Sequence, residues 1–316
     1  MNSILLSLSH KQLNWEDKWP PGFRGIGFPG SSRKSASGPF GSVCIQEFIT
    51  EQWTIRFTIV DLVEKFTAQF LIDKPALYTS QQLKGTSTIK CNKHPGIMIR
   101  KSQVVISYSP SQLATVEWLP GLHVSFDMIM AEEMCKPMIH LFPGIYKIIT
   151  LNNSWMTPAT WADMESLDMI QSILRCPHPA EIYQPYFEVR VNDLLLNYLI
   201  LSTKHKPVYP GPSAKEEQAI TEIREFVGNN LTAHYYIGAL ARKAGMNEQR
   251  FKQLFKIMVG MGPYEFLLRK RMRKAKQMLL HGKSAKEVAR HFGYRPSNFT
   301  HLFRNFFGYG PSDLPK

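Results

Sequence analysis

Two patterns of apolar positions divide the chain into an early and a late part. Between about residues 43 and 130 the apolar residues form short runs of β-branched and aromatic side chains separated by glycine- and proline-containing turns, which is typical of strands. The clearest runs are Trp53–Leu62, Gln103–Tyr108, Thr115–Leu119 and His123–Met130. Several short strands in succession predict an antiparallel sandwich or barrel.

After residue 130 the apolar spacing becomes helical. Trp161–Leu174 and Ala180–Leu201 both have this spacing, and the second segment is apolar around most of its circumference. Such a helix is either buried against the sheet or shared with a second subunit. The segment Lys204–Ser213 follows, and its three prolines and one glycine are typical of a linker.

These changes predict an α+β fold with two domains. Residues 1–42, whose second half is rich in glycine, proline and serine, are expected to form a loosely ordered arm. A β-sandwich with following helices is expected over 43–203, the linker over 204–213, and an all-α domain over 214–316.

The all-α domain contains two copies of one pattern, separated by the same constant offset throughout. Each copy predicts a helix, a tight turn at a glycine and a second helix, which is the helix-turn-helix pattern. The matching pairs include Ala241 and Ala289, Gly245 and Gly293, Phe251 and Phe299, Phe255 and Phe303, and Gly262-Pro263 and Gly310-Pro311.

Helix signals within the two copies indicate caps, cores and a connecting helix. Asn247 is expected to cap the second helix of the first copy, and Ser297 or Asn298 the equivalent helix of the second. Helical spacing indicates that Phe299, Phe303 and Phe306 are core residues rather than base-stacking platforms. Between the copies, Pro263–Leu280 predicts one helix about 27 Å long.

The net charge of +13 is concentrated in the last third of the chain. Residues 1–210 carry a net charge of +2, whereas residues 211–316 carry +11. This asymmetry favours nucleic acid as a partner, ahead of an anionic membrane surface or a merely solvated basic face.

The polar face of each second helix carries side chains that can read base edges in a major groove. Lysines and arginines near these faces, and in the basic run of the connecting helix, are suited to phosphate contacts. For a single residue a solvated role competes with a DNA contact, but the two faces together favour DNA. The predicted base-reading residues are Gln249, Lys252, Gln253, Arg295, Pro296, Ser297 and His301, and the predicted phosphate contacts are Lys256, Arg269, Arg271, Arg290 and Arg304.

The cysteines and the N-terminus point to a reduced compartment. The four cysteines are widely spaced, without CxxC pairs or metal-ligand spacing, so reduced thiols and no metal cofactor are expected. The N-terminus lacks a basic leader and a cleavage site, and no apolar run is long enough for a membrane span, which indicates a cytoplasmic protein. Catalytic fingerprints such as a P-loop or nucleophile elbow are absent, so no enzymatic activity is expected.

Roughly a third of the chain, from Glu217 to Leu314, resembles the DNA-binding domain of the AraC/XylS family of bacterial transcription regulators. The resemblance lies in IGALARKAGMNEQRFKQLFK, GPYEFLLRKRMRKAKQMLL and SAKEVARHFGYRPSNFTHLFRNFFGYGPSDL. In one departure from the family pattern, the interval from Gly293 to Phe299 is one residue shorter.

The resemblance implies two helices reading adjacent major grooves of duplex DNA, through positions equivalent to Gln249, Lys252, Gln253, Pro296 or Ser297, and His301. It also implies a cupin-like N-terminal domain that binds a small-molecule effector and forms a homodimer, and activation through contact with RNA polymerase. The segment ILRCPHPAEIYQPYFEVRVNDLLLNYLI resembles siderophore-responsive members of the ferripyochelin-regulator type, which suggests a ferric siderophore as effector.

Two other functions remain alternatives. The N-terminal domain could be a cupin-like enzyme or metal-binding domain fused to a DNA module, in which case purified protein would contain stoichiometric metal. The C-terminal domain could instead bind RNA or single strands, which a competition assay would reveal.

Overall fold

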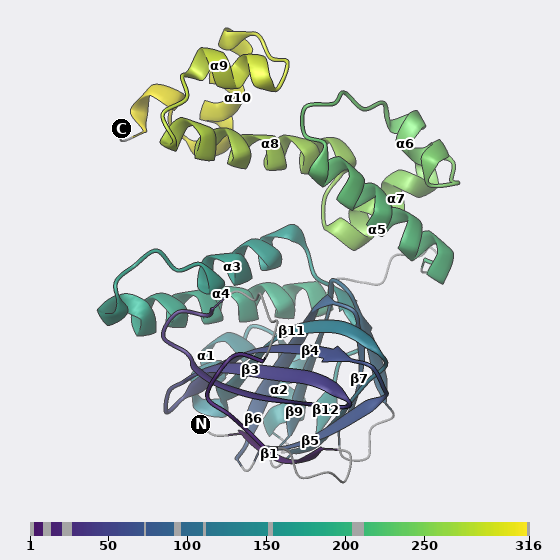
Figure 1. The fold of residues 1–316 in the computed structure, drawn as a ribbon, viewed down its shortest axis with the longest axis vertical. Coiled ribbons are helices and arrows are strands. Elements are labelled where there is room, and N and C mark those ends of the chain that lie inside the picture. The colour runs from purple at the N-terminus through teal and green to yellow at the C-terminus, as the bar shows by residue number, and fades with distance from the viewer. Residues whose placement is uncertain are drawn as a thin grey trace. The chain divides into compact units, whose positions relative to one another are not determined.

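The computed structural model describes residues 3–8, 14–20, 27–72, 74–91, 96–109, 112–150, 154–203 and 212–314 (Figure 1). The chain divides into two compact units, Met1–Lys206 and Pro207–Lys316. The boundary falls within the segment expected to be a linker, of which residues 204–211 lie outside the described part of the chain.

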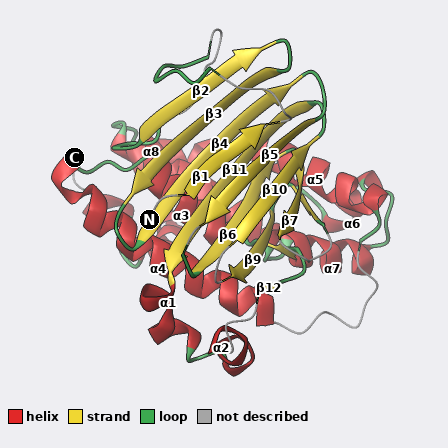
Figure 2. Ribbon diagram, turned by 90° about the horizontal axis from the view of Figure 1, so that it is seen from below, coloured by secondary structure: helices red, strands yellow, loops and turns green. Residues whose placement is uncertain are grey.

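The first unit contains two antiparallel sheets that pack face to face (Figure 2). The smaller sheet contains, in spatial order, β1 (Ser3–Leu8), β5 (Phe66–Ile72), β10 (Gln112–Trp118), β7 (Thr86–Cys91) and β8 (Ile97–Arg100). The larger sheet contains β12 (Trp155–Met156), β9 (Gln103–Ser109), β6 (Ala76–Lys84), β11 (Gly121–Ala131), β4 (Trp53–Leu62), β3 (Gly41–Ile49) and β2 (Ser32–Gly38), with β13 (Thr160–Trp161) also paired to β9. This arrangement confirms the predicted cupin-like β domain.

The central strand β4 is buried on both faces, and its sequence shows why. Ile55 and Phe57 belong to the core beneath the helices, whereas Val60 belongs to the core between the sheets. Because strand side chains alternate, Arg56 and Thr58 also point between the sheets, and both are buried. The interior of the sandwich therefore holds polar groups, which need partners there.

Helices cover the outer face of the larger sheet. They are α1 (Glu132–Ile139), α2 (Pro143–Thr150), α3 (Met164–Leu174), the 3-10 turn η1 (Ala180–Ile182) and α4 (Tyr183–Thr203). Side chains of α3 and α4, including Ile170, Phe187 and Leu194, share a core with strand residues such as Ile55. The opposite face of α4 exposes Val189 and Ile200, so this helix is buried on one side only.

The expectation of a loosely ordered arm over residues 1–42 is corrected for the strands within it. Ser32–Gly38 form β2 at the edge of the larger sheet, paired with β3, and Ser3–Leu8 form β1, paired with β5. The polar sequence of β2 suits an edge strand, because most residues of such a strand stay accessible to solvent. Ser35 is among the few residues of β2 that are buried. Residues 9–13 and 21–26 lie outside the described chain.

The second unit is helical throughout its described length. Its elements are α5 (Ala214–Asn229), α6 (Ile237–Lys243), α7 (Glu248–Val259), α8 (Pro263–Leu280), α9 (Ala285–His291), α10 (Pro296–Phe307) and the 3-10 turn η2 (Pro311–Asp313). The pairs α6–α7 and α9–α10 have equal lengths and begin at equivalent positions of the two copies, and α8 runs between them (Figure 1). The prediction of two helix-turn-helix units joined by a long helix is confirmed.

The turns of the two units have matching backbone geometry. Gly245 and Gly293 have φ of 67° and 72°, a region in which a Cβ atom is strained. In the first turn Met246 N–H donates to Ala241 O at 3.0 Å, and in the second Tyr294 N–H donates to Ala289 O at 2.9 Å. The two copies therefore have turns of equal length.

The cap predicted for the second copy is wrong, whereas that of the first is confirmed. Asn247 Oδ1 accepts from Arg250 N–H at 2.8 Å at the start of α7. In α10 the N-cap residue is Arg295, which makes no side-chain cap, and Pro296 occupies the first turn instead of Ser297 or Asn298 serving as the cap. A proline fixes φ near the helical value and removes one N–H that would have no partner within the helix, so it starts the helix earlier.

The aromatic residues of the second copy are mainly core. Phe299 and Phe303 are fully buried with Phe292 and Met272, whereas Phe306 is partly buried at the edge of this cluster. Phe299 and Phe303 therefore pack the unit together and are not available for base stacking. Separately, no helix in the described part of the chain is long and apolar enough to cross a membrane.

Candidate nucleic-acid interface

The outer face of α7 presents polar side chains one helical turn apart. Gln249 and Lys252 are exposed, and Gln253 is half-buried. Lys252 Nζ lies 3.5 Å from Glu248 Oε2, but both side chains are more than half exposed, so this pair adds little stability. Such a face can exchange its water contacts for contacts to a polar partner.

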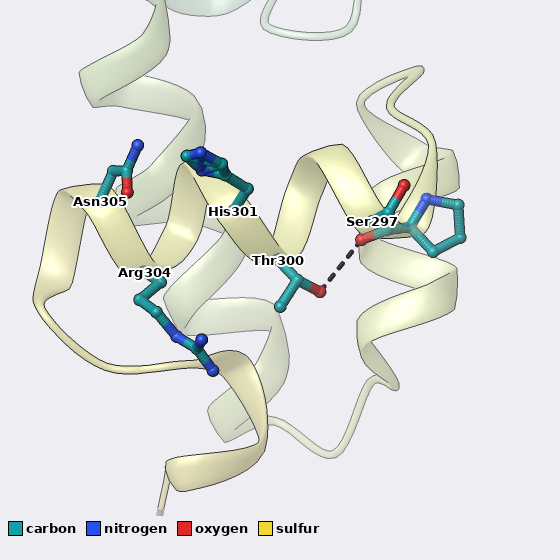
Figure 3. Close-up of a pocket in the computed structure, with 6 residues that line it drawn as sticks. Ser297, Thr300, His301, Arg304 and Asn305 are labelled. Carbon is teal, nitrogen blue, oxygen red and sulfur yellow. Dashed lines mark hydrogen bonds between the residues drawn. The ribbon is translucent and has the colours of Figure 1, made fainter.

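The equivalent face of α10 borders a shallow surface hollow of about 650 Å³ (Figure 3). Thr300 Oγ1 donates to Pro296 O at 3.0 Å, which leaves its methyl group as the free part of the side chain. The hollow is lined by Pro296, Ser297, Thr300, His301, Arg304 and Asn305. Pro296, Ser297 and His301 of the predicted set therefore line one hollow, and Arg295 is exposed at the start of the helix.

Three of the predicted phosphate contacts lie on accessible surface. Lys256 and Arg304 occupy equivalent positions in the last turns of α7 and α10, and both are exposed. Arg290 is exposed in the last turn of α9. Arg269, on α8, is half-buried.

The prediction that Arg271 contacts phosphate is wrong. Its side chain is 4% exposed, and its guanidinium donates to Leu231 O at 2.6 Å, Ala233 O at 2.9 Å and Tyr294 Oη at 2.8 Å. The basic run RKRMRK suggests a solvated face, but the helical period places Arg271 beside Met272 and Ala275 on the buried side of α8.

A bidentate ion pair fixes α7 to α5. Arg250 Nε donates to Glu216 Oε1 at 2.8 Å, and its terminal nitrogen donates to Oε2 at 3.0 Å. Glu216 also accepts from Ser213 N–H and completes a capping box at the start of α5. These bonds lower the pKa of Glu216 to about 2, the bond from Arg250 having the largest effect.

A row of polar residues crosses the larger sheet of the first unit and faces the smaller sheet. Glu47, Arg56, Asp127 and Ser80 are direct cross-strand neighbours on β3, β4, β11 and β6. Arg56 Nε donates to Glu47 Oε1 at 2.7 Å, and Ser125 Oγ donates to Asp127 Oδ2 at 3.1 Å. Burial raises the pKa of the Asp127 carboxyl, against the opposing effects of Ser80 and Arg56.

The histidines and cysteines of the described chain do not form a metal site. No group of three His, Cys, Asp or Glu side chains there could hold a metal ion. His123 is buried, with Nδ1 accepting from Thr86 N–H at 3.1 Å and Nε2 2.7 Å from Leu119 O, so both nitrogens have backbone partners. His94 lies outside the described residues.

Sequence reasoning missed two features that the structure brings together. Asn305 lies on the same hollow as His301, and the signal was its position one helical turn later on the same face. The row around Arg56 and Asp127 joins strands as distant along the chain as β3 and β11, and no local pattern could have found it.

One family model and two relatives are similar to parts of this chain. The model of a helix-turn-helix domain family matches residues 240–316. The thermoregulatory protein LcrF of Yersinia pestis is 21% identical over 220 residues, which cover 68% of this chain and 78% of that protein. The virulence regulon transcriptional activator VirF of Yersinia enterocolitica is similar to the same extent, with 21% identity over 68% of this chain and 78% of its own.

Two solved structures that are similar to this chain differ in how much of it they cover. A crystal structure of fatty acid-bound ToxT from Vibrio cholerae is 13% identical and covers 84% of this chain and 95% of its own, with a TM-score of 0.33. A DNA-binding transcriptional dual regulator from Escherichia coli K-12 is 24% identical and covers 34% of this chain and 93% of its own, with a TM-score of 0.28.

Proposed function

We propose that the chain is a transcription regulator of the AraC/XylS type, which binds a specific duplex DNA site and activates transcription under the control of a small-molecule effector. In this proposal α7 and α10 each enter a major groove. The observation that carries it is the repetition of one helix-turn-helix unit, with equal helix lengths and turn geometry, at either end of α8. An 18-residue helix is about 27 Å long, close to the roughly 34 Å between successive major grooves.

The base contacts are assigned to the exposed faces of the two helices. Gln249, Lys252 and Gln253 would read one groove, and Arg295, Pro296, Ser297 and His301 the other, with Asn305 added from the same hollow. Lys256, Arg269, Arg290 and Arg304 would hold phosphates. We assign no enzymatic reaction to the protein. A regulator that binds chromosomal DNA would act in the bacterial cytoplasm.

The effector and partners form a second part of the proposal. An apolar surface hollow of about 500 Å³, within the usual size range of ligand pockets, is a place where an effector could bind. It is lined by Leu141, Phe142, Pro143, Gly144, Ile145, Trp155 and Thr203. A ferric siderophore is the first candidate effector to test. Homodimerisation would use the face of α4 that exposes Val189 and Ile200. Activation of transcription would require contact with RNA polymerase.

In-vitro selection of bound duplexes by the full-length protein, with and without ferric siderophores, tests the proposal. We expect an enriched motif with two half-sites about one helical turn apart. Selection that enriches no motif under any condition, or a preference for single strands in competition, would contradict it.

Gln253→Ala should weaken binding to the selected duplex by about 1–3 kcal/mol, because a side chain that reads a base contributes about that much discrimination. Binding to random duplex should change little. The measurement is a competition titration on both duplexes, with Gln218→Ala on the exposed face of α5 as the matched control. An equal loss on random DNA would remove Gln253 from the base-reading set.

Lys256→Ala should weaken binding to all duplexes and reduce the slope of log affinity against log salt by about 0.9, the value for one released counterion. Affinity measured across a salt series checks this. A slope equal to that of the wild type would remove Lys256 from the phosphate contacts.

A further inference from the structure

The most unusual charged residue of the second unit is Arg271, which is buried on α8 and donates no hydrogen bond to a carboxylate of the described chain. Its donors reach two backbone carbonyls, of Leu231 and Ala233, and the hydroxyl of Tyr294. The guanidinium carbon also lies 5.3 Å from the centre of the Tyr294 ring, within the range of a cation–π contact. One side chain on α8 therefore contacts two other segments of the domain.

These partners lie in two different parts of the domain. Leu231 and Ala233 lie in the loop between α5 and α6, which leads into the first unit. Tyr294 follows Gly293 in the turn of the second unit, directly before α10. Arg271 thus connects the loop before the first unit with the turn that precedes α10 in the second unit.

Two further contacts hold the same loop against the second unit. Leu231 packs against the core cluster that contains Phe299 and Phe303. A Cβ atom added at Gly293 would lie only 3.1 Å from His234 Nε2, so the loop and the turn are in contact at that point. The loop and the second turn therefore form one packed surface with Arg271 beneath it.

We propose that Arg271 is a positioning residue that fixes α10 relative to α7, so that the two units read DNA at one set spacing. This inference rests on the proposed DNA-binding function. Arginine suits the role because its planar fork holds several acceptors in fixed directions, whereas a lysine ammonium on a flexible stem does not. Removing it would take the donor away from the carbonyls of Leu231 and Ala233 and free the turn at Tyr294.

The consequence for DNA binding concerns the distance between half-sites. One inserted base pair moves the second half-site by about 3.4 Å and rotates it by about 35°. A rigid reader then loses the contacts of one groove and should lose at least about tenfold in affinity, which corresponds to about 1.4 kcal/mol. A reader without the Arg271 contacts should adapt and lose less.

The test compares three duplexes: the duplex selected by the wild-type protein, and versions with one base pair inserted or removed between the half-sites. For the wild type we expect the altered spacings to bind at least about tenfold more weakly. For Arg271→Lys and for the milder Tyr294→Phe, the penalty should fall to about threefold, mainly through weaker binding to the original duplex. Lys274→Ala, which removes one exposed charge from α8, should weaken all three duplexes equally and retain the wild-type penalty.

The outcomes separate this inference from the proposed function. If Arg271→Lys retains the wild-type spacing penalty, or weakens all three duplexes equally, the positioning role is overturned while DNA recognition stands. If selection yields no motif, the proposed function fails, and hydrogen exchange without DNA decides the structural part. Arg271→Lys should then speed exchange of the Tyr294 amide and leave that of Met246 unchanged. A Tyr294 exchange rate equal to that of the wild type would refute the connection.

Discussion

Arg56→Met should destabilise the first unit by about 3–5 kcal/mol, the cost of removing one partner from a buried charge cluster. Arg56 is 4% exposed and lies between Glu47 and Asp127 in the row that crosses the larger sheet. Methionine fills a similar volume but leaves the Glu47 carboxylate without its bond from Arg56 and Asp127 without a neighbouring cation. The interior between the sheets offers little solvent to replace them.

Tryptophan fluorescence is suited to this measurement because all six tryptophans precede residue 162. The urea transition reported by fluorescence should move to lower denaturant for Arg56→Met. Asp127→Asn is the matched control: it retains the shape and removes a carboxyl whose pKa burial already raises, so it should cost less than Arg56→Met. A loss for Arg56→Met below about 1 kcal/mol would show that solvent or rearrangement satisfies the row.

Phe303→Ala should destabilise the second unit by about 3–5 kcal/mol, the range for a buried phenylalanine replaced by alanine. Phe303 is fully buried, and its ring centre lies 4.6 Å from that of Phe307 and 5.7 Å from that of Phe299. The cavity would open beneath α10, so the variant should also lose specific DNA binding at temperatures where the wild type binds.

The helical signal in circular dichroism should report this loss, while the tryptophan transition of the first unit stays near its wild-type midpoint. Phe255→Ala, at the equivalent position of the first copy, is fully buried and should cost a similar amount. Tyr236→Ala, whose side chain is 81% exposed, should cost little. If Phe303→Ala unfolded no earlier than Tyr236→Ala, the second copy could not depend on this core.

Much of the second unit could be predicted from the sequence because its interactions are local. The constant offset between the two copies predicts two units, Gly245 and Gly293 predict their turns, and helical spacing predicts the core position of Phe303. Helices form their backbone hydrogen bonds between neighbouring turns, so the pattern along the chain contains most of the information. The first cap was predicted for the same reason, and the second failed where Pro296 started α10 earlier.

Local patterns along the chain thus predict the two-domain fold, the repeated helix-turn-helix units and the polar faces of α7 and α10. The burial of Arg271 follows from tertiary packing, because this residue belongs to a basic run but its side chain points toward Leu231 and Tyr294. Tertiary packing also decided the pairing of β2 and the row from Glu47 to Ser80, since strand partners are chosen by contacts between distant segments. Burial and long-range pairing depend on the whole packed unit, which no local run of residues specifies.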